Sequence, residues 1–240
     1  MIGLGGLYTL FEASARSLDS DRGQAGVLVA IIVILSALVV DHWLLGEPVR
    51  GELRRLGLGL PDRRGLLGAL FPCVLLVLVV PAYFHVTEAS WTLYPGWARL
   101  LPGLFAQAGI AEEVLFRGFL FRHLRQGRSF LGAASVASVP FVLVHVSLFL
   151  TMPWPIASAS VLLAVLISFP LAYLFEFGGN TIWGPALVHW VVQGMVKIIV
   201  VEGDSLGFPV LWMLASAIIP FVVFTYRLIG SSGRTFGSAV

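Results

Sequence analysis

The chain has 240 residues, of which 58% are hydrophobic and only 12% are charged, and its formal net charge is +2. Ordinary soluble domains carry about 25% charged residues, so this chain has too few to cover a water-facing surface. The mean hydropathy of +0.93 agrees with a membrane protein. The single cysteine, Cys73, excludes a disulfide framework and a CxxC metal or redox motif.

Uncharged stretches long enough to cross a bilayer follow one another along the chain. About 20 apolar residues span the hydrocarbon core as a helix, and residues 129–175 run for 47 positions without Asp, Glu, Lys or Arg. The prolines at 153 and 155 predict a turn that divides this stretch into two helices. The stretches are continuously apolar rather than alternating, which favours helices over a β-barrel. The predicted spans are 23–45, 65–87, 98–121, 130–151, 156–176, 181–201 and 207–229.

These spans predict an all-α fold, a polytopic transmembrane bundle of about seven to eight helices. The chain has no internal repeat and no long linker, so we expect one bundle over residues 23–230. Residues 1–22 are expected to form a separate N-terminal segment, either an interfacial helix or an eighth crossing. Residues 231–240 are expected to be a flexible cytoplasmic tail.

Arginines gather in alternate connections and predict the orientation. The positive-inside rule places such loops in the cytoplasm, whereas 88–97, 152–155 and 202–206 contain no Lys or Arg. The N-terminus is then outside and the C-terminus cytoplasmic, in a multi-pass protein of a prokaryotic plasma membrane. Lys197 is expected to snorkel toward the outer end of its span. The cytoplasmic arginines of these two loops are Arg50, Arg54, Arg55, Arg63 and Arg64, and Arg122, Arg125 and Arg128.

Three ionisable residues within six positions mark the third span as the most informative part of the sequence. A charge near the bilayer centre costs at least about 2.5–3.5 kcal/mol, so these residues need partners. Glu113 and Arg117 are four apart and predict an ion pair on one helical face. Glu112 lies about 100° around the helix and is predicted to be free of that arginine.

His145 and His189 are the histidines that lie within later spans. Together with Glu112 they can hold and deprotonate a water, or bind zinc or another divalent metal. At 1.5 Å per residue, Glu112 and His189 lie at similar depths, about 14 and 12 Å from the inner ends of their spans, and His145 at about 22 Å. The fourth span is therefore expected to start near Ser135 or Ser138, with a kink at Pro140.

Three short motifs occur in order on these spans. Residues 112–117 read EExxxR, residues 141–145 read FxxxH, and residues 189–193 read HxxxQ, which nearly matches HxxxN. In this order the motifs resemble the CAAX prenyl protease and bacteriocin-processing (Abi) family of intramembrane proteases. The segment that precedes His189 also resembles this family, and it reads Gly179-Asn180-Thr181-Ile182-Trp183-Gly184-Pro185. The resemblance covers about residues 98–200, the expected catalytic core.

The resemblance implies a membrane-embedded endopeptidase, of the glutamate type or the metallo type, that acts on a CAAX-type or leader-type peptide. Glu112 and His145 would activate the water, and His189 with Gln193 would stabilise the oxyanion. Glu113, Arg117 and Phe141 would support them. If a metal is bound, Glu112, His145 and His189 would hold it. The expected partners are the lipid bilayer and a peptide or membrane-protein substrate, with no nucleic acid, and the site is expected to open toward the cytoplasmic half.

Two alternatives stay open. Gln193 stands where the motif has asparagine, and one extra methylene displaces a donor that must lie about 2.7–3.1 Å from the oxyanion. A catalytically weak or inactive member that acts as a membrane immunity or scaffold protein is therefore the main alternative. A transporter or proton carrier is a third, because Glu and His also build proton relays in membranes.

Overall fold

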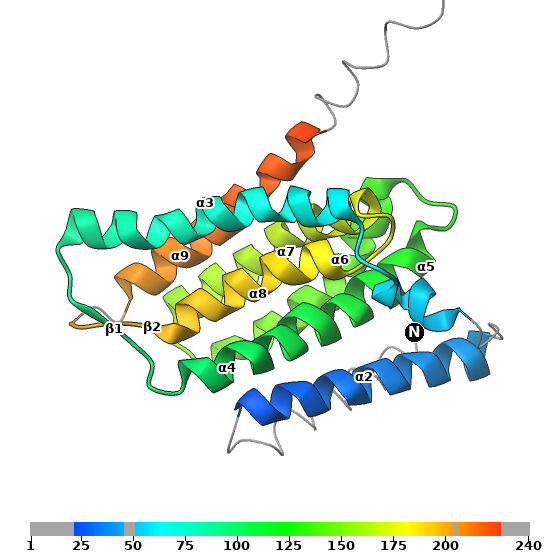
Figure 1. Cartoon of the computed structure of the whole chain (residues 1–240), viewed down its shortest axis with the longest axis horizontal. Helices are drawn as coiled ribbons and strands as arrows, with labels where there is room; N and C mark the ends of the chain where they lie inside the picture. Colours follow the sequence, from blue (N-terminus) through cyan, green and yellow to red (C-terminus); the bar gives the residue numbers. More distant parts are fainter. Residues whose placement is uncertain (1–21, 46–50, 204–205, 227–240) are drawn as a thin grey trace, which may run out of the picture.

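The computed structural model describes residues 22–45, 51–203 and 206–226, and it is a bundle of long helices (Figure 1). The expected all-α class is confirmed. The N-terminal segment and the C-terminal tail expected from the sequence lie outside the described residues, apart from Arg22. The elements are α2 (Arg22–Leu45), η1 (Arg54–Leu58), α3 (Arg63–Thr87), β1 (Trp91–Leu93), α4 (Trp97–Leu104), η2 (Phe105–Glu112), η3 (Val114–Phe121), α5 (Arg122–Arg125), α6 (Phe130–Val146), η4 (Ser147–Leu150), α7 (Trp154–Phe177), α8 (Trp183–Ile198), β2 (Ile199–Val201), α9 (Gly207–Ile218) and η5 (Ile219–Thr225).

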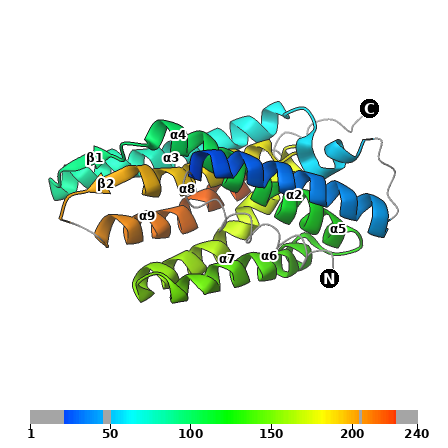
Figure 2. The same ribbon diagram turned by 90° about the horizontal axis from the view of Figure 1, so that it is seen from below.

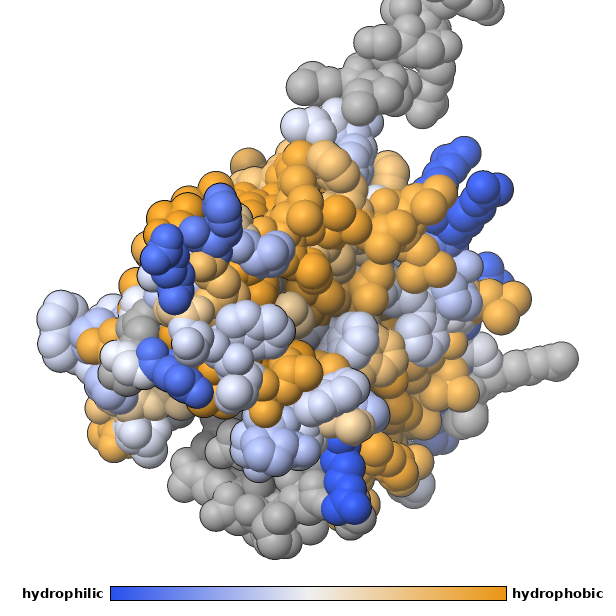
Figure 3. All heavy atoms as spheres, turned by 60° about the vertical axis from the view of Figure 1, so that its left-hand side comes forward, coloured by the Kyte–Doolittle hydropathy of each residue, from blue (hydrophilic) through white to orange (hydrophobic). Residues whose placement is uncertain are grey.

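Five of the described helical segments are long and apolar enough to cross a membrane. Their outward faces carry large exposed apolar side chains, such as Leu67, Leu143 and Ile218, and Figure 3 shows broad areas of hydrophobic atoms on one face. Such a surface suits lipid rather than water. The chain is therefore a multi-pass integral membrane protein, as the sequence predicted. The five segments are 25–43, 54–87, 130–150, 154–177 and 207–225.

The third and sixth predicted spans are also helical, but other helices surround them. Seven of the eight residues of η3 are buried, and α8 buries half of its 16 residues. The third span is not a uniform α-helix, because α4 passes into two π-helical parts, η2 and η3, on either side of Glu113. π-helical turns are wider than α-helical ones and occur frequently at functional sites.

The two ends of the bundle are built differently. At one end β1 pairs antiparallel with β2, with Trp91 opposite Val201. The sixth span was predicted to continue to 201, which is wrong: α8 ends at Ile198, and the apolar, β-branched residues that follow pair with β1 instead. Figure 2 shows the turn between α6 and α7 at this same end, with α5 at the other. The connections that contain no arginine thus lie opposite the arginine-bearing ones.

The boundaries of α6 differ from the expectation based on depth. This helix begins at Phe130, where the Ser129 side chain accepts a hydrogen bond from the Gly132 N–H, and Pro140 lies within it. A start near Ser135 or Ser138 is therefore wrong. The depth argument assumed parallel helices that start at one level, and in the folded bundle His145 reaches the same cavity as Glu112 without a later start.

Candidate active site

Glu113 lies at the centre of a buried cluster of charged and polar side chains. Arg117 Nη1 donates to Glu113 Oε1 at 3.0 Å, which is the ion pair expected from their spacing. His189 Nδ1 lies 2.7 Å from the same oxygen. All three side chains are at most 3% exposed. Because a carboxylate oxygen only accepts, Nδ1 of His189 carries the proton, and Nε2 is left to face the neighbouring Glu112.

Glu112 points away from the Glu113–Arg117 pair, as its helical position predicted. Its side chain is 15% exposed, and its Oε2 lies 3.7 Å from Nε2 of His189. The carboxylate lines a cavity of about 580 Å³. Glu113 therefore holds His189 through its Nδ1, on the side away from the cavity. Glu112 lies between Nε2 of His189 and the cavity.

His145 lines the same cavity as Glu112. Its Nδ1 lies 2.8 Å from the carbonyl oxygen of Phe141, which can only accept, so this nitrogen carries a proton and Nε2 is the nitrogen that can act as a base. The Phe141 ring is buried and packs edge-on against His145 and, further away, against His189. The Arg117 guanidinium lies 5.0 Å from the centre of that ring. The Phe141 ring therefore contacts a side chain from each of the three motifs, namely Arg117, His145 and His189.

Gln193 and Lys197 also line this cavity. They follow His189 at four-residue steps on α8, so all three share one helical face. The Lys197 side chain borders the cavity of Glu112 and His145, and the expectation that it snorkels toward the outer end of its span stays a prediction. The four-residue spacing from His189 was the signal in the sequence that could have placed it there.

The cavity extends toward the end of the bundle that carries β1 and β2. Its lining includes Met152 and Pro153, in the turn between α6 and α7, and Pro209 near the start of α9. It therefore opens away from the arginine-bearing loops. If the arginine-bearing end is cytoplasmic, as predicted, this differs from the expectation that the site opens toward the cytoplasmic half, because depth counted along single helices did not reveal where neighbouring helices leave space.

Among the residues that the structure describes, no group of three or more His, Cys, Asp or Glu side chains is arranged to hold a metal ion. Glu112 and His189 come close to each other, but Nδ1 of His189 is bonded to Glu113. The described side chains around Glu112 therefore do not form a metal ligand set. The expectation of zinc or another divalent metal stays a prediction.

The segment 179–185, which precedes His189, forms hydrogen bonds with the loop between α2 and α3. The Ile182 N–H donates to the Gly57 carbonyl at 3.0 Å, and Trp183 Nε1 donates to the Gly59 carbonyl at 2.7 Å. Gly184 approaches the backbone of α3 so closely that a Cβ there would lie 2.9 Å from the Gly65 carbonyl oxygen. The contacts of segment 179–185 therefore position the N-terminal part of α8, from which His189 projects.

Fold and site together define a polytopic helical membrane protein with a carboxylate and histidine site inside the bundle. Residues 94–195 match the family described as type II CAAX prenyl endopeptidase Rce1-like. The match agrees with the resemblance of the three motifs to the CAAX prenyl protease family, a family of membrane proteases. The matched residues include all three motifs and end just before Lys197. Comparison with curated proteins found no match.

Proposed function

We propose that this protein is an intramembrane endopeptidase in which Glu112 and His145 activate a water for attack on a peptide bond. The observation that carries the proposal is that Glu112, His145 and Gln193 line one cavity, with His189 directly behind Glu112. A carboxylate and an imidazole beside the same space can remove a proton from a water molecule that lies between them and the substrate carbonyl. The family supports peptide hydrolysis as the reaction.

In the proposed reaction the Glu112 carboxylate takes the first proton from the attacking water, and His145 Nε2 orients that water. The attack leaves a negative charge on the carbonyl oxygen, which needs hydrogen-bond donors. An oxyanion role for His189 requires a proton on Nε2, which makes the ring an imidazolium with Glu113 as its counter-ion. The Gln193 side-chain amide would be the second donor. Glu112 then returns its proton to the leaving amine.

A proteolysis assay in liposomes tests this proposal. The full chain is reconstituted with a prenylated peptide ending in a CAAX sequence or with a membrane-anchored leader peptide. We expect the wild type to cleave at least one of them, and Glu112→Gln and His145→Ala to cleave it at least about 100-fold more slowly. Glu202→Gln and His85→Ala are matched controls, because both side chains are exposed and lie outside the cavity. Equal cleavage by wild type and both site variants, or no cleavage of either peptide by the wild type, would contradict the proposal.

The second candidate function is a scaffold or immunity protein that keeps the bundle but does not turn over substrate. One observation favours it: Gln193 lines the cavity at the position where the family motif has asparagine. The longer amide changes where its donor lies. Gln193→Asn separates the two functions. A gain in cleavage indicates a weakened enzyme, whereas a scaffold function requires that neither the wild type nor Gln193→Asn cleaves the peptides.

A further inference from the structure

One polar side chain in the cavity of Glu112 has no part in the reaction described above. Gln107 lines this cavity and is partly buried, and its side chain forms no hydrogen bond with any other described residue. Ser147 and Ser160 also line the cavity, but their hydroxyls already donate to a backbone carbonyl and to a methionine sulfur. Because an amide without partners is unfavourable in apolar surroundings, Gln107 indicates a hydrogen-bonding molecule in this cavity.

The π-helical conformation of η2 brings Gln107 to the same side as Glu112. The two residues are five apart, and in a π-helix residues i and i+5 are joined by one hydrogen-bonded turn. In an α-helix five residues correspond to a rotation of about 140° beyond one full turn, which would direct the two side chains to different faces. The wider turn therefore explains why both side chains line one cavity.

Gln107 lies on the entrance side of Glu112. The helix that carries both residues starts as α4, which follows β1 after the short connection 94–96 (Figure 1). Residues that precede Glu112 are therefore nearer to the end of the bundle that carries β1 and β2. The cavity extends toward the same end. A peptide that approaches Glu112 from this end thus passes Gln107 first.

The surroundings of Gln107 favour a peptide main chain as its partner. Most of the residues that line the cavity are apolar, among them Leu148, Ile156 and Leu163. A peptide group that leaves water for such a cavity loses its hydrogen bonds and needs replacements from the protein. A glutamine amide has one carbonyl acceptor and two N–H donors. It can therefore bond both the N–H and the carbonyl of one extended residue, as paired residues of an antiparallel sheet do.

We propose that Gln107 is a substrate-binding residue whose side-chain amide holds the main chain of an extended peptide beside Glu112. This inference rests on the proposed peptidase function and adds to it a residue outside the three motifs. Because the contact is to the main chain, it selects an extended conformation rather than a particular sequence. The role differs from that of Gln193, which concerns the oxyanion in the transition state.

Binding and cleavage of peptides by Gln107→Met test the proposal. Methionine is as unbranched and flexible as glutamine but has no amide, and the change removes no hydrogen bond within the described part of the chain. We expect the melting temperature in detergent to stay the same. For the peptides of the liposome assay, affinity and kcat/KM should fall about tenfold, because two neutral hydrogen bonds are lost. Gln126→Met is the matched control at an exposed position near the other end of the bundle, and it should behave like the wild type.

Substrate analogues separate a main-chain contact from a structural effect. Binding is measured in a Glu112→Gln background, which prevents turnover. The probes are the same peptides and a set of variants, each with one peptide bond replaced by an ester, which removes one N–H donor at a time. With Gln107 present, one ester should bind about fivefold more weakly than its parent peptide, whereas Gln107→Met should bind the two equally. A purely structural role of Gln107 would weaken the binding of parent and ester alike.

The outcomes distinguish this inference from the peptidase function. If the wild type cleaves a peptide and Gln107→Met binds and cleaves it equally well, the role of Gln107 is overturned while the peptidase function stands. If the wild type cleaves neither peptide, the peptidase function fails and the binding measurements alone decide on Gln107. Weaker binding by Gln107→Met together with loss of the ester effect then supports the main-chain contact, and equal or absent binding overturns it.

Discussion

At the residue scale, Glu113 decides the arrangement of the catalytic candidates. One of its carboxylate oxygens accepts from both Arg117 and His189, and all three side chains are buried. Adjacent glutamates in the sequence thus have different surroundings: Glu113 faces a cation and a histidine, whereas Glu112 borders the cavity. Substitutions at the two positions should therefore have different consequences.

Glu113→Gln should lower both stability and activity, whereas Glu112→Gln should lower activity alone. Loss of the Glu113 charge leaves Arg117 buried without a counter-ion, which costs about 3–5 kcal/mol when one partner of a buried pair is removed. Thermal unfolding in detergent and peptide cleavage measure the two effects. Glu176→Gln is the control, since its pair with Arg125 is partly exposed and contributes only about 0–1 kcal/mol. Equal melting temperatures for Glu113→Gln and Glu112→Gln would refute this assignment.

Gln193→Asn tests the length of the amide side chain. If His189 and residue 193 act together on the oxyanion, shortening the side chain should raise kcat by about tenfold or more with little change in KM, because the gain arises in the transition state. Steady-state cleavage of the same peptide measures both constants. A change confined to KM would place residue 193 in substrate binding instead.

At the element scale, close backbone approaches hold the connecting segments against the central helices. Leu56 of η1 packs on Gly118 of η3, and Gly26 of α2 packs on Gly103 of α4, where a Cβ would lie 2.1 Å from the Gly103 carbonyl oxygen. Small residues permit such contacts between membrane helices, where van der Waals packing drives association. The wider π-helical turns of η2 and η3 lie in the same region.

Gly118→Ala should destabilise the protein by about 1–3 kcal/mol, because the added methyl overlaps the Leu56 carbonyl and η1 has to move. Thermal unfolding in detergent measures the effect. Gly132→Ala serves as control, because the only neighbour of its Cβ within 4 Å is the Ser129 hydroxyl at 3.2 Å. A Gly118→Ala protein as stable as this control would show that η1 is not held as described.

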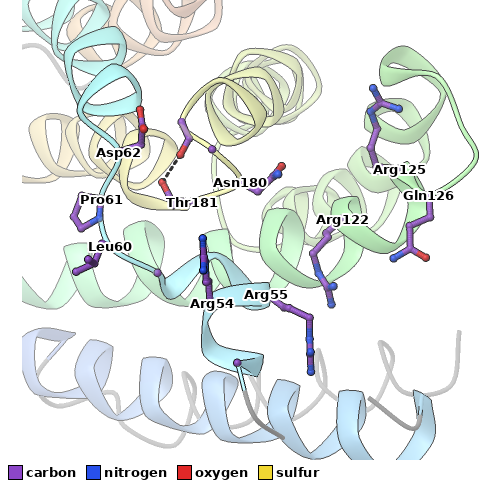
Figure 4. Close-up of a pocket in the computed structure, with 14 residues that line it drawn as sticks. Arg54, Arg55, Leu60, Pro61, Asp62, Arg122, Arg125, Gln126, Asn180 and Thr181 are labelled. Carbon is purple, nitrogen blue, oxygen red and sulfur yellow. Dashed lines mark hydrogen bonds between the residues drawn. The ribbon is translucent and has the colours of Figure 1, made fainter. Parts of the chain in front are cut away.

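At the scale of the whole molecule, two cavities lie toward opposite ends of the bundle. The cavity of Glu112 extends toward β1 and β2. A second cavity, of about 1070 Å³, is lined by arginines of η1 and α5 and by the α7–α8 turn (Figure 4). If the arginine end is cytoplasmic, as the positive-inside rule predicts, a peptide would reach Glu112 from the other half of the membrane. The orientation of the bundle thus determines which side supplies the substrate.

Single cysteines test this orientation. In a Cys73→Ala background, which removes the only native cysteine, Glu88→Cys marks the β1 end and Gln126→Cys marks the arginine end, and both positions are exposed. A membrane-impermeant maleimide should label Glu88→Cys in intact cells and Gln126→Cys only after the membrane is opened. The reverse pattern would invert the predicted orientation, and labelling of both from one side would contradict the arrangement of the helices.

The chemistry of individual residues could be predicted from the sequence more fully than their surroundings. The spacing of Glu113 and Arg117 predicted their ion pair, and three ordered motifs predicted the family. The link between Glu113 and His189 could not be predicted, because 76 positions separate them and only helix packing brings them together. The place of Lys197 beside the cavity could not be predicted for the same reason: its helical position was known, but not which neighbouring helices leave a cavity beside it.

The sequence by itself determined that this is a helical membrane protein, because so few charges cannot cover a soluble surface and long apolar stretches satisfy their backbone only as helices in lipid. It also determined which ionisable residues lie within those helices. Only the tertiary structure decided which of them share a cavity, at which end that cavity opens, and where α8 gives way to β2. These features depend on contacts between helices distant in the chain, and the periodicity of a single helix contains no information about them.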